Sequence, residues 1–343
     1  MPAIFLFGMM LVAQIAPAQA AARSGSHYML GRGLPVGESG ITLGGYASAN
    51  YLELDHQSSR FEISDLSLFL SWDSGQRWRA FSEMEIGEAL IFDHDGPSTR
   101  DAEFDLERTY IDWYGRHDLN LRFGKFLTPF GHWNQVHADP LVWTVSRPLT
   151  TNAGFANHAT GAMLYGDLET ATGTVGFQFY IDATEKLDPR KDKPSPPLEL
   201  GAFDNAFGGR LVYHSEDDSL QLGLSVADFA PHRLPGRETI AGLDFLWHRN
   251  GFELSGEWIT RSDSPIGSSW FVQAVAPLGR RLYLVDRYED FDRLGFSQEI
   301  RTNAIGLVFR PVPAISLKAE AVEGDQQPGL TQDGLRLSAS VLF

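Results

Sequence analysis

The sequence predicts an all-β fold, a transmembrane antiparallel β-barrel of about 16 strands with a long third loop folded into the lumen. Segments of about ten residues in which apolar and polar side chains alternate recur along most of the chain. The connections between these segments are alternately very short and long. After the N-terminal region no apolar run reaches the roughly 18 residues that a membrane-spanning helix needs.

The N-terminal region differs in composition from the rest of the chain. The run from Ile4 to Ile15 is apolar but short, and Ala18-Gln19-Ala20 is a small-x-small cleavage signal. We therefore expect a signal peptide over residues 1–20, a short N-terminal segment over 21–40 and the barrel domain over 41–343. A buried N-terminal helix is the alternative. A signal peptide would direct the mature chain out of the cytoplasm, as localisation to a bacterial outer membrane requires.

Composition excludes several classes of function. The 343-residue chain carries 44 acidic and 28 basic residues, which give a formal net charge of -16, and it has no cysteine. This acidity argues against a nucleic-acid partner, because phosphate binding needs clustered basic side chains. The lack of cysteine excludes disulfides, thiolate metal sites and thiol nucleophiles.

The predicted strands are an even number, as single-chain bacterial barrels require. Each has apolar side chains at every second position, which is the period of a strand with two different faces. They cover residues 41–54, 60–72, 76–92, 103–114, 118–127, 159–168, 171–182, 205–214, 218–229, 238–248, 251–261, 267–276, 279–290, 299–310, 313–323 and 333–343.

The connections support a barrel rather than a soluble sandwich. Every second connection is a tight link: Ser74-Gly75, Gly115-Arg116-His117, Glu169-Thr170, Ser215-Glu216-Asp217, Asn250-Gly251, Pro277-Leu278 and Pro311-Val312. The others are longer and more polar, as in Asp93–Ala102, Ala183–Asp204 and Gly324–Gln332. Short turns at one rim and long loops at the other are typical of outer-membrane barrels.

Alternation also assigns the two faces of the strands. In "FELSGEWITR", Phe252, Leu254 and Trp258 face one side, while Glu253 and Glu257 face the other. Recurring charges on one face predict a water-filled lumen, because a dry core would not tolerate them. Opposite charges facing each other there would create a transverse field. The expected lumen-lining residues are Arg79, Glu83, Glu85, Glu107, Arg210, Glu253, Glu257, Lys318, Glu320 and Arg336.

The longest connection, residues 127–158, has an unusual composition. It follows the fifth strand and is rich in bulky apolar side chains such as Phe130, Trp133 and Trp143. A loop exposed to water would be polar, and a wide barrel can bury an apolar loop only in its own lumen. We therefore predict that this segment folds inward and forms the constriction of a channel.

The start of this loop resembles a known family. "RFGKFLTPFG", Arg122 to Gly131, is similar to the Gly-x-Phe-x-x-Pro-Phe-Gly signature of the phosphate-selective porin O/P-like family, and "SRPL", Ser146 to Leu149, resembles a later part of the same loop. The resemblance implies an inward-folding third loop and a homotrimeric outer-membrane pore. The chain departs from the family where Leu127-Thr128 precedes the proline, because the family places a lysine there.

These patterns predict a porin, a passive diffusion channel for small hydrophilic solutes or ions, in contact with outer-membrane lipid and lipopolysaccharide. A phosphate- or anion-selective porin is the alternative within this class. We expect no enzymatic activity, no cofactor and no metal. The expected constriction residues are Arg122, Lys125, His132, Trp133, His137, Asp139, Arg147 and His158.

Alternatives from other classes rest on a few residues of the same loop. His132, His137 and His158 with Asp139 suggest a metal site, but their spacing matches no zinc pattern. Asn134, His137 and Ser146 are the residue types of a lipid hydrolase, without a recognisable nucleophile motif. A structural or adhesive barrel would be narrower and filled by side chains.

Overall fold

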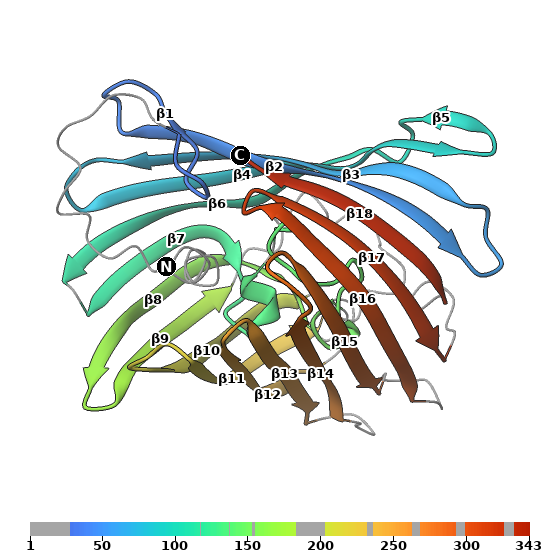
Figure 1. Ribbon diagram of the computed structural model, residues 1–343. Coiled ribbons are helices and arrows are strands. Elements are labelled where there is room, and N and C mark those ends of the chain that lie inside the picture. Colours follow the sequence, from blue (N-terminus) through green and yellow to red (C-terminus); the bar gives the residue numbers. More distant parts are fainter. Residues whose placement is uncertain are drawn as a thin grey trace.

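The computed structural model of the chain is a closed antiparallel β-barrel (Figure 1). It describes residues 28–116, 118–136, 138–152, 155–182, 203–231, 236–262, 268–292, 299–325 and 333–343. The signal peptide expected over residues 1–20 lies outside this part of the chain, as does His137.

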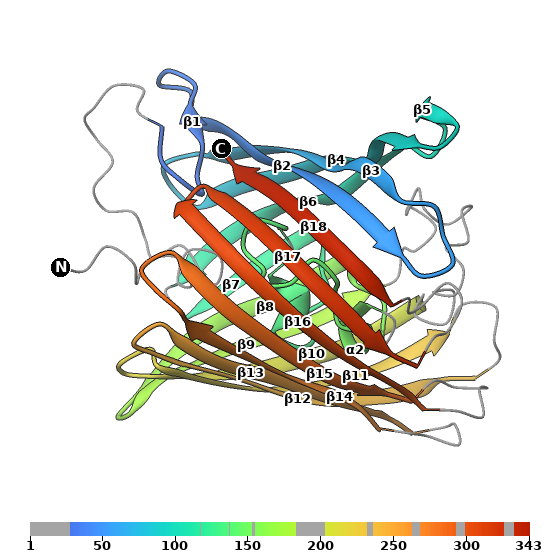
Figure 2. The same cartoon turned by 45° about the vertical axis from the view of Figure 1, so that its right-hand side comes forward.

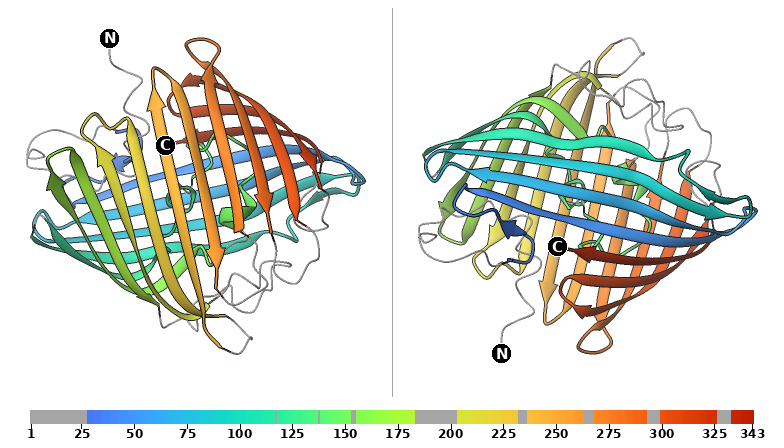
Figure 3. Two further views of the ribbon diagram at one scale, coloured as in Figure 1. Left: turned by 90° about the horizontal axis from the view of Figure 1, so that it is seen from below. Right: turned by 90° about the horizontal axis from the view of Figure 1, so that it is seen from above.

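Sixteen strands form the closed ring, as the sequence predicted. Each pairs with its neighbours in the chain, and the last strand pairs with the first to complete the barrel (Figures 1 and 3). They are β2 (Ile41–Leu54), β3 (Arg60–Asp73), β4 (Trp78–Asp93), β6 (Glu103–Arg116), β7 (Leu119–Leu127), β8 (His158–Thr170), β9 (Gly173–Asp182), β10 (Phe203–Ser215), β11 (Leu220–Pro231), β12 (Glu238–Arg249), β13 (Phe252–Arg261), β14 (Ser268–Pro277), β15 (Leu282–Phe291), β16 (Ile300–Val312), β17 (Ile315–Gly324) and β18 (Gly334–Leu342).

Four short elements supplement the ring. Strand β1 (Leu34–Pro35) pairs with the first residues of β2, and β5 (Gly96–Ser98) extends β4 beyond the rim. The 3-10 helix η1 (Trp133–Gln135) and the helix α2 (Leu149–Asn152) belong to the loop between β7 and β8. Among the residues that the structure describes, no helix is long and apolar enough to span a membrane.

The two rims differ in the length of their connections. At the short rim the strands are joined by residues 74–77, 117–118, 171–172, 216–219, 250–251, 278–281 and 313–314. At the other end, the long rim, the first three connections are residues 55–59, 94–102 and 128–157. The segment 128–157, here called the inner loop, is the third long-rim connection, as expected.

The strands have an apolar outer face and a polar inner face. On β13, Phe252, Leu254 and Trp258 are 50%, 38% and 37% exposed, whereas Glu257 is buried. On β17, Leu317 faces outward and Lys318 is buried. Closure of the sheet pairs the strand backbone groups around the ring, which is the condition for crossing hydrocarbon.

The first and last strands of the ring, β2 and β18, meet where the barrel closes. The backbones of Gly45 and Phe343 exchange hydrogen bonds, each with a nitrogen–oxygen distance of 2.8 Å. Beyond Phe343 the edge of β2 is covered by β1, where Leu34 pairs with Leu43. A Cβ on Gly45 would lie 2.2 Å from the Ser67 carbonyl oxygen, so this close approach requires glycine.

Candidate functional site

The inner loop lies inside the barrel, against the wall formed by β11 to β17 (Figures 1 and 2). Its two ends are tied together close to β7 and β8. Thr128 donates to Asn157 across the base of the loop, with a nitrogen–oxygen distance of 2.9 Å. The amide of Asn134 donates to the carbonyls of both residues, at 2.8 and 3.0 Å. The prediction that this segment folds into the lumen is therefore confirmed.

Glutamates on the barrel wall hold the loop through its donor groups. Glu257 accepts from the Trp133 N–H at 2.5 Å and from the Thr151 hydroxyl at 3.2 Å. Glu320 accepts from two successive backbone N–H groups, those of Val145 at 2.9 Å and Ser146 at 3.0 Å. Charge-assisted hydrogen bonds of this kind are stronger than neutral ones.

Two further glutamates hold the loop in the same way. Glu289 accepts from the N–H and the hydroxyl of Thr150 at 2.7 and 2.9 Å, at the start of α2. Glu253 accepts from the indole N–H of Trp143 at 2.9 Å. These four inner-face carboxylates therefore serve as anchors for the loop.

Cations on the same wall bind loop oxygens. Lys318 donates to the carbonyls of Asp139 and Thr144 at 2.8 and 3.1 Å. Arg287 donates to the Ser146 carbonyl at 2.8 Å and to the Ser146 hydroxyl at 2.6 Å. Because the wall supplies both donors and acceptors, the loop backbone between residues 139 and 150 is held through its N–H and its C=O groups.

Aromatic side chains fill the space between loop and wall. The rings of Phe130 and Phe155 lie 4.6 Å apart, centre to centre, within an apolar cluster that includes Phe126. Trp143 lies 5.0 Å from the Tyr283 ring, and the Arg310 guanidinium stacks over Trp143 at 3.9 Å. Burial of these rings gives the loop a hydrophobic contribution to its stability in addition to its hydrogen bonds.

Lys125 and His158 lie at the base of the loop, near the end of β7 and at the start of β8. Pairing between β6 and β7 ends at Thr109 and Lys125, and β7 continues paired only with β8. There the Lys125 amine lies 3.5 Å from an oxygen of Asp105, and the His158 ring nitrogen lies 2.5 Å from an oxygen of Glu107. These buried contacts connect β6 to the two strands that carry the loop.

Arginines on the wall opposite the loop anchors are paired within the sheet. Asp73, Arg79, Asp112 and Arg122 follow one another along one row across β3, β4, β6 and β7. Arg79 binds Asp73 at 2.8 Å, and Arg122 binds both oxygens of Asp112 at 2.7 and 2.9 Å. Arg122 also stacks on Tyr110 at 3.7 Å. The charges of this row are neutralised by their neighbours rather than by charges across the lumen.

Other inner-face residues named from the sequence are also paired. Arg108 binds Glu83, and Arg210 binds Asp244 at 2.6 Å. Arg336 stands directly across from Glu320 on the neighbouring strand. Arg108 with Glu83, and Arg210 with Asp244, therefore form ion pairs along the wall.

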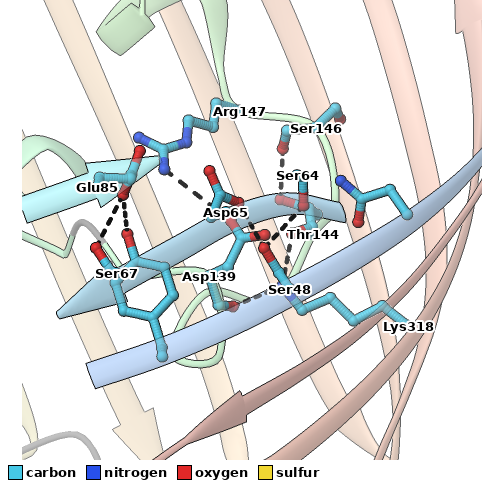
Figure 4. A network of polar contacts seen from close by, with 12 residues as sticks. Ser48, Ser64, Asp65, Ser67, Glu85, Asp139, Thr144, Ser146, Arg147 and Lys318 are labelled. Atoms are coloured by element: carbon cyan, nitrogen blue, oxygen red, sulfur yellow. Dashed lines mark hydrogen bonds and ion pairs between the residues drawn. The ribbon is translucent and has the colours of Figure 1, made fainter. Parts of the chain in front are cut away.

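One polar cluster lies on the side of the loop that faces β2, β3 and β4. On the wall, Glu85 accepts from the Tyr46 hydroxyl at 2.6 Å, and Asp65 accepts from the Ser48 hydroxyl at 2.5 Å. From the loop, Arg147 points toward these two carboxylates (Figure 4). The side chain of Arg147 is 35% exposed, and its nearest guanidinium nitrogen lies 4.0 Å from an Asp139 oxygen. We call Asp65, Glu85, Asp139 and Arg147 the Arg147 cluster.

The remaining predicted loop residues have structural contacts. Trp133 is buried and donates to Glu257. His132 contacts the Gln221 amide at 3.1 Å. Burial lowers the pKa of His132 to about 4, which Asp244 opposes and Arg210 reinforces, so the ring is neutral near pH 7.

Of the candidate metal and hydrolase residues that the structure describes, His132, His158, Asn134 and Ser146 each contact other groups. His132 and His158 contact different strands, β11 and β6. Asn134 donates to backbone carbonyls of the loop, and the Ser146 hydroxyl accepts from Arg287. Sequence reasoning missed Arg287, Glu289 and Arg310 as loop contacts. Alternation of Glu289 with the outward-facing Leu284 and Tyr288 is the signal that assigns Glu289 to the inner face.

The chain was compared with protein families, with characterised sequences and with solved structures. No family model matches the chain. A protein of Aquifex aeolicus (strain VF5), described only as uncharacterized, is 22% identical to this chain. The alignment covers 89% of this chain and 80% of that protein.

Several solved structures of outer-membrane channels superimpose on most of this chain. An anion-selective porin from Comamonas acidovorans superimposes with a TM-score of 0.62 at 16% identity, over 88% of this chain and 99% of its own. OmpF of Salmonella typhi, in complex with daunomycin, gives 0.62 at 9% identity, over 90% and 99%. The outer membrane channel DcaP of Acinetobacter baumannii gives 0.55 at 12% identity, over 88% and 97%. This likeness establishes that the chain shares the barrel fold of bacterial porins.

Proposed function

We propose that this protein is a porin of the bacterial outer membrane that lets small hydrophilic solutes and inorganic ions diffuse passively, with a preference for cations. The observation that carries the proposal is the Arg147 cluster. It lies between strands β2 to β4 and a loop that buried carboxylates such as Glu257, Glu289 and Glu320 anchor to the opposite wall. The proposed route for solutes passes this cluster.

The balance of charge along this route supports cation preference. Three carboxylates, Asp65, Glu85 and Asp139, stand with one guanidinium, Arg147 (Figure 4). A ring of acidic side chains at the narrowest part of a pore attracts cations and repels anions. Three arginines elsewhere on the inner wall, Arg79, Arg122 and Arg210, add little net charge, because each is bound to a carboxylate.

Specialised phosphate transport is less well supported. A site that removes water from phosphate needs several converging charge-assisted donors. Arg147 is the single lysine or arginine of the inner loop. Of the two basic residues in the motif that resembles the phosphate-selective family, Lys125 pairs with Asp105 and Arg122 with Asp112.

Export by a signal peptide over residues 1–20, contact with lipopolysaccharide and assembly into homotrimers complete the proposal. The apolar outer face of the described strands, with Phe179, Ile181 and Leu243 more than half exposed, supports contact with lipid. Trimers rest on the family resemblance alone. Chemical cross-linking in intact outer membranes tests them, and a ladder that stops at monomers would contradict them.

Reversal potential in a planar bilayer under a potassium chloride gradient tests the function. We expect a current that favours potassium over chloride and is not blocked by phosphate. The double variant Asp65→Asn, Glu85→Gln should lose this preference while it still conducts. Glu323→Gln, which removes an exposed carboxylate at the far end of β17, is the matched control. Absence of current would refute the pore, and chloride preference with block by phosphate would favour the phosphate-selective alternative.

A further inference from the structure

We propose that a row of aromatic rings on the inner wall binds carbohydrates as they pass through the pore. The row, here called the aromatic row, consists of Tyr46 on β2, Phe69 on β3, Phe81 on β4 and Tyr110 on β6, which are neighbouring strands of the ring. Successive ring centres lie 5.7, 5.8 and 5.4 Å apart. At one end, Tyr46 donates to Glu85 of the Arg147 cluster at 2.6 Å, so the row borders the proposed route for solutes. The inference rests on the proposed function and names a class of solute for it.

The aromatic row lies on the lumen face of the wall. Phe69 alternates with Leu68 and Leu70, which are exposed on the outer face of β3. Alternation places Phe81 and Tyr110 on the inner face in the same way, where they are direct partners in the pairing of β4 with β6. Phe69, Phe81 and Tyr110 are each half-buried rather than enclosed. The row therefore presents apolar surface to the lumen.

Polar side chains border the aromatic row on both sides. Along each strand, the residues two positions before and after the ring share its face. They are Ser67 and Ser71 beside Phe69, Arg79 and Glu83 beside Phe81, and Arg108 and Asp112 beside Tyr110. Hydroxyl, carboxylate and guanidinium groups together can donate and accept hydrogen bonds. Each of these rings is thus an apolar platform between two hydrogen-bonding side chains.

The charges beside the aromatic row are neutralised within the wall. Three ion pairs do this: Arg108 with Glu83, Arg79 with Asp73, and Arg122 with Asp112. Because opposite charges in contact cancel at a distance, the row neither attracts nor repels a solute strongly through net charge. Its polar groups are also held in place, so a solute that binds them does not have to order them first.

Carbohydrates match this combination of groups. One face of a pyranose ring carries C–H groups, which pack on an aromatic ring, and its hydroxyls both donate and accept hydrogen bonds. Inorganic ions have no apolar surface to bury against the row, whereas a wholly apolar solute would leave the bordering polar groups without partners. The row therefore suits neutral solutes with flat faces and many hydroxyls.

Organic cations match the aromatic row less well. The guanidinium of Arg108 already lies over Phe81, 5.0 Å from the ring centre, and that of Arg122 lies over Tyr110 at 3.7 Å. A second cation on these rings would be repelled by the first. A sugar hydroxyl, in contrast, can accept a hydrogen bond from a guanidinium group.

Block of the potassium current by maltotriose, measured with purified full-length protein in planar bilayers, tests the inference. Maltotriose should interrupt the current. Phe81→Leu keeps the apolar bulk but removes the ring, so it should raise the half-blocking concentration by about two- to tenfold. Phe81→Tyr should restore the value of the unmodified protein. Phe104→Leu removes a ring that is 66% exposed on the outer face of β6 and should leave the value unchanged.

A polyethylene glycol of similar mass separates binding from obstruction, because it has no pyranose ring. If Phe81→Leu changed the block by both compounds equally, or if maltotriose left the current of the unmodified protein intact, the carbohydrate site would be refuted while the pore remained. If Phe81→Leu weakened block by tetraethylammonium and not by maltotriose, the row would bind organic cations and the inference would be wrong. If the protein carried no current without sugar, the proposed function itself would fail.

Discussion

Removal of Glu320 tests whether wall carboxylates hold the inner loop in place. In Glu320→Ala, the N–H groups of Val145 and Ser146 lose their acceptor. A buried N–H left without a partner costs about 1–3 kcal/mol, and the lower half of this range applies where the wet lumen can supply water. Two such groups make the seated loop about 2–3 kcal/mol less stable relative to a released loop. Since 1.4 kcal/mol is tenfold, the released population rises roughly 30- to 150-fold.

Cysteine labelling measures this population, because the natural chain has no cysteine. Ala138 belongs to the inner loop, is 2% exposed and packs against Tyr46 of β2. In an Ala138→Cys background, a hydrophilic maleimide reacts only when the loop opens, so its rate follows the open population. The labelling rate should rise roughly 30- to 150-fold in Glu320→Ala and stay unchanged in the control Glu323→Ala. Equal rates in the two variants would show that Glu320 is not an anchor.

Three further predictions concern the loop and the barrel closure. Trp143→Ala removes three contacts of a large ring with the wall, so the seated loop should become about 3–5 kcal/mol less stable relative to the released loop. Labelling of Ala138→Cys should therefore be faster, and an unchanged rate would contradict this. The pKa of His132 falls to about 4 on folding from an ordinary value of 6.5, so the stability that its neutral ring contributes is complete above pH 6.5 and is lost as pH falls through 4. The labelling rate of Ala138→Cys, divided by that of a free thiol at the same pH because thiolate declines with pH, should rise over that window, and His132→Gln should flatten the profile. Gly45→Ala places a Cβ 2.2 Å from a β3 carbonyl and 2.9 Å from the Phe343 ring, so the yield of closed barrel on semi-native gels should fall, and a normal yield would contradict the crowding.

The barrel could be predicted from the sequence because the patterns that specify it, alternation along a strand and tight turns, each lie within a short segment. Alternation along each strand fixes which side chains share a face, as with Phe252 and Glu253 on β13. The tight turns fix which strands are neighbours. The apolar composition of the inner loop also indicated where it would be buried.

The roles of the inner-face charges could not be read in the same way. Alternation assigns Glu257 and Glu320 to the lumen, but only the path of the loop decides that they hold its N–H groups instead of lining the route of solutes. Likewise, Lys125 belongs to the family-like motif, yet the separation of β7 from β6 places it against Asp105. A contact between segments far apart in sequence leaves no periodic trace in either one.

The hydrogen-bonded contact between Gly45 and Phe343 has a consequence for the order of folding. The two strands that close the barrel are separated by nearly the whole chain, so a flexible chain would lose about 5 kcal/mol of loop-closure entropy in bringing them together. Until the last residues are in place, both edges of the sheet remain open to pairing with other chains. Closure is therefore expected to be the slow, final step of assembly, and loss of even a few C-terminal residues should favour aggregates over a less stable barrel.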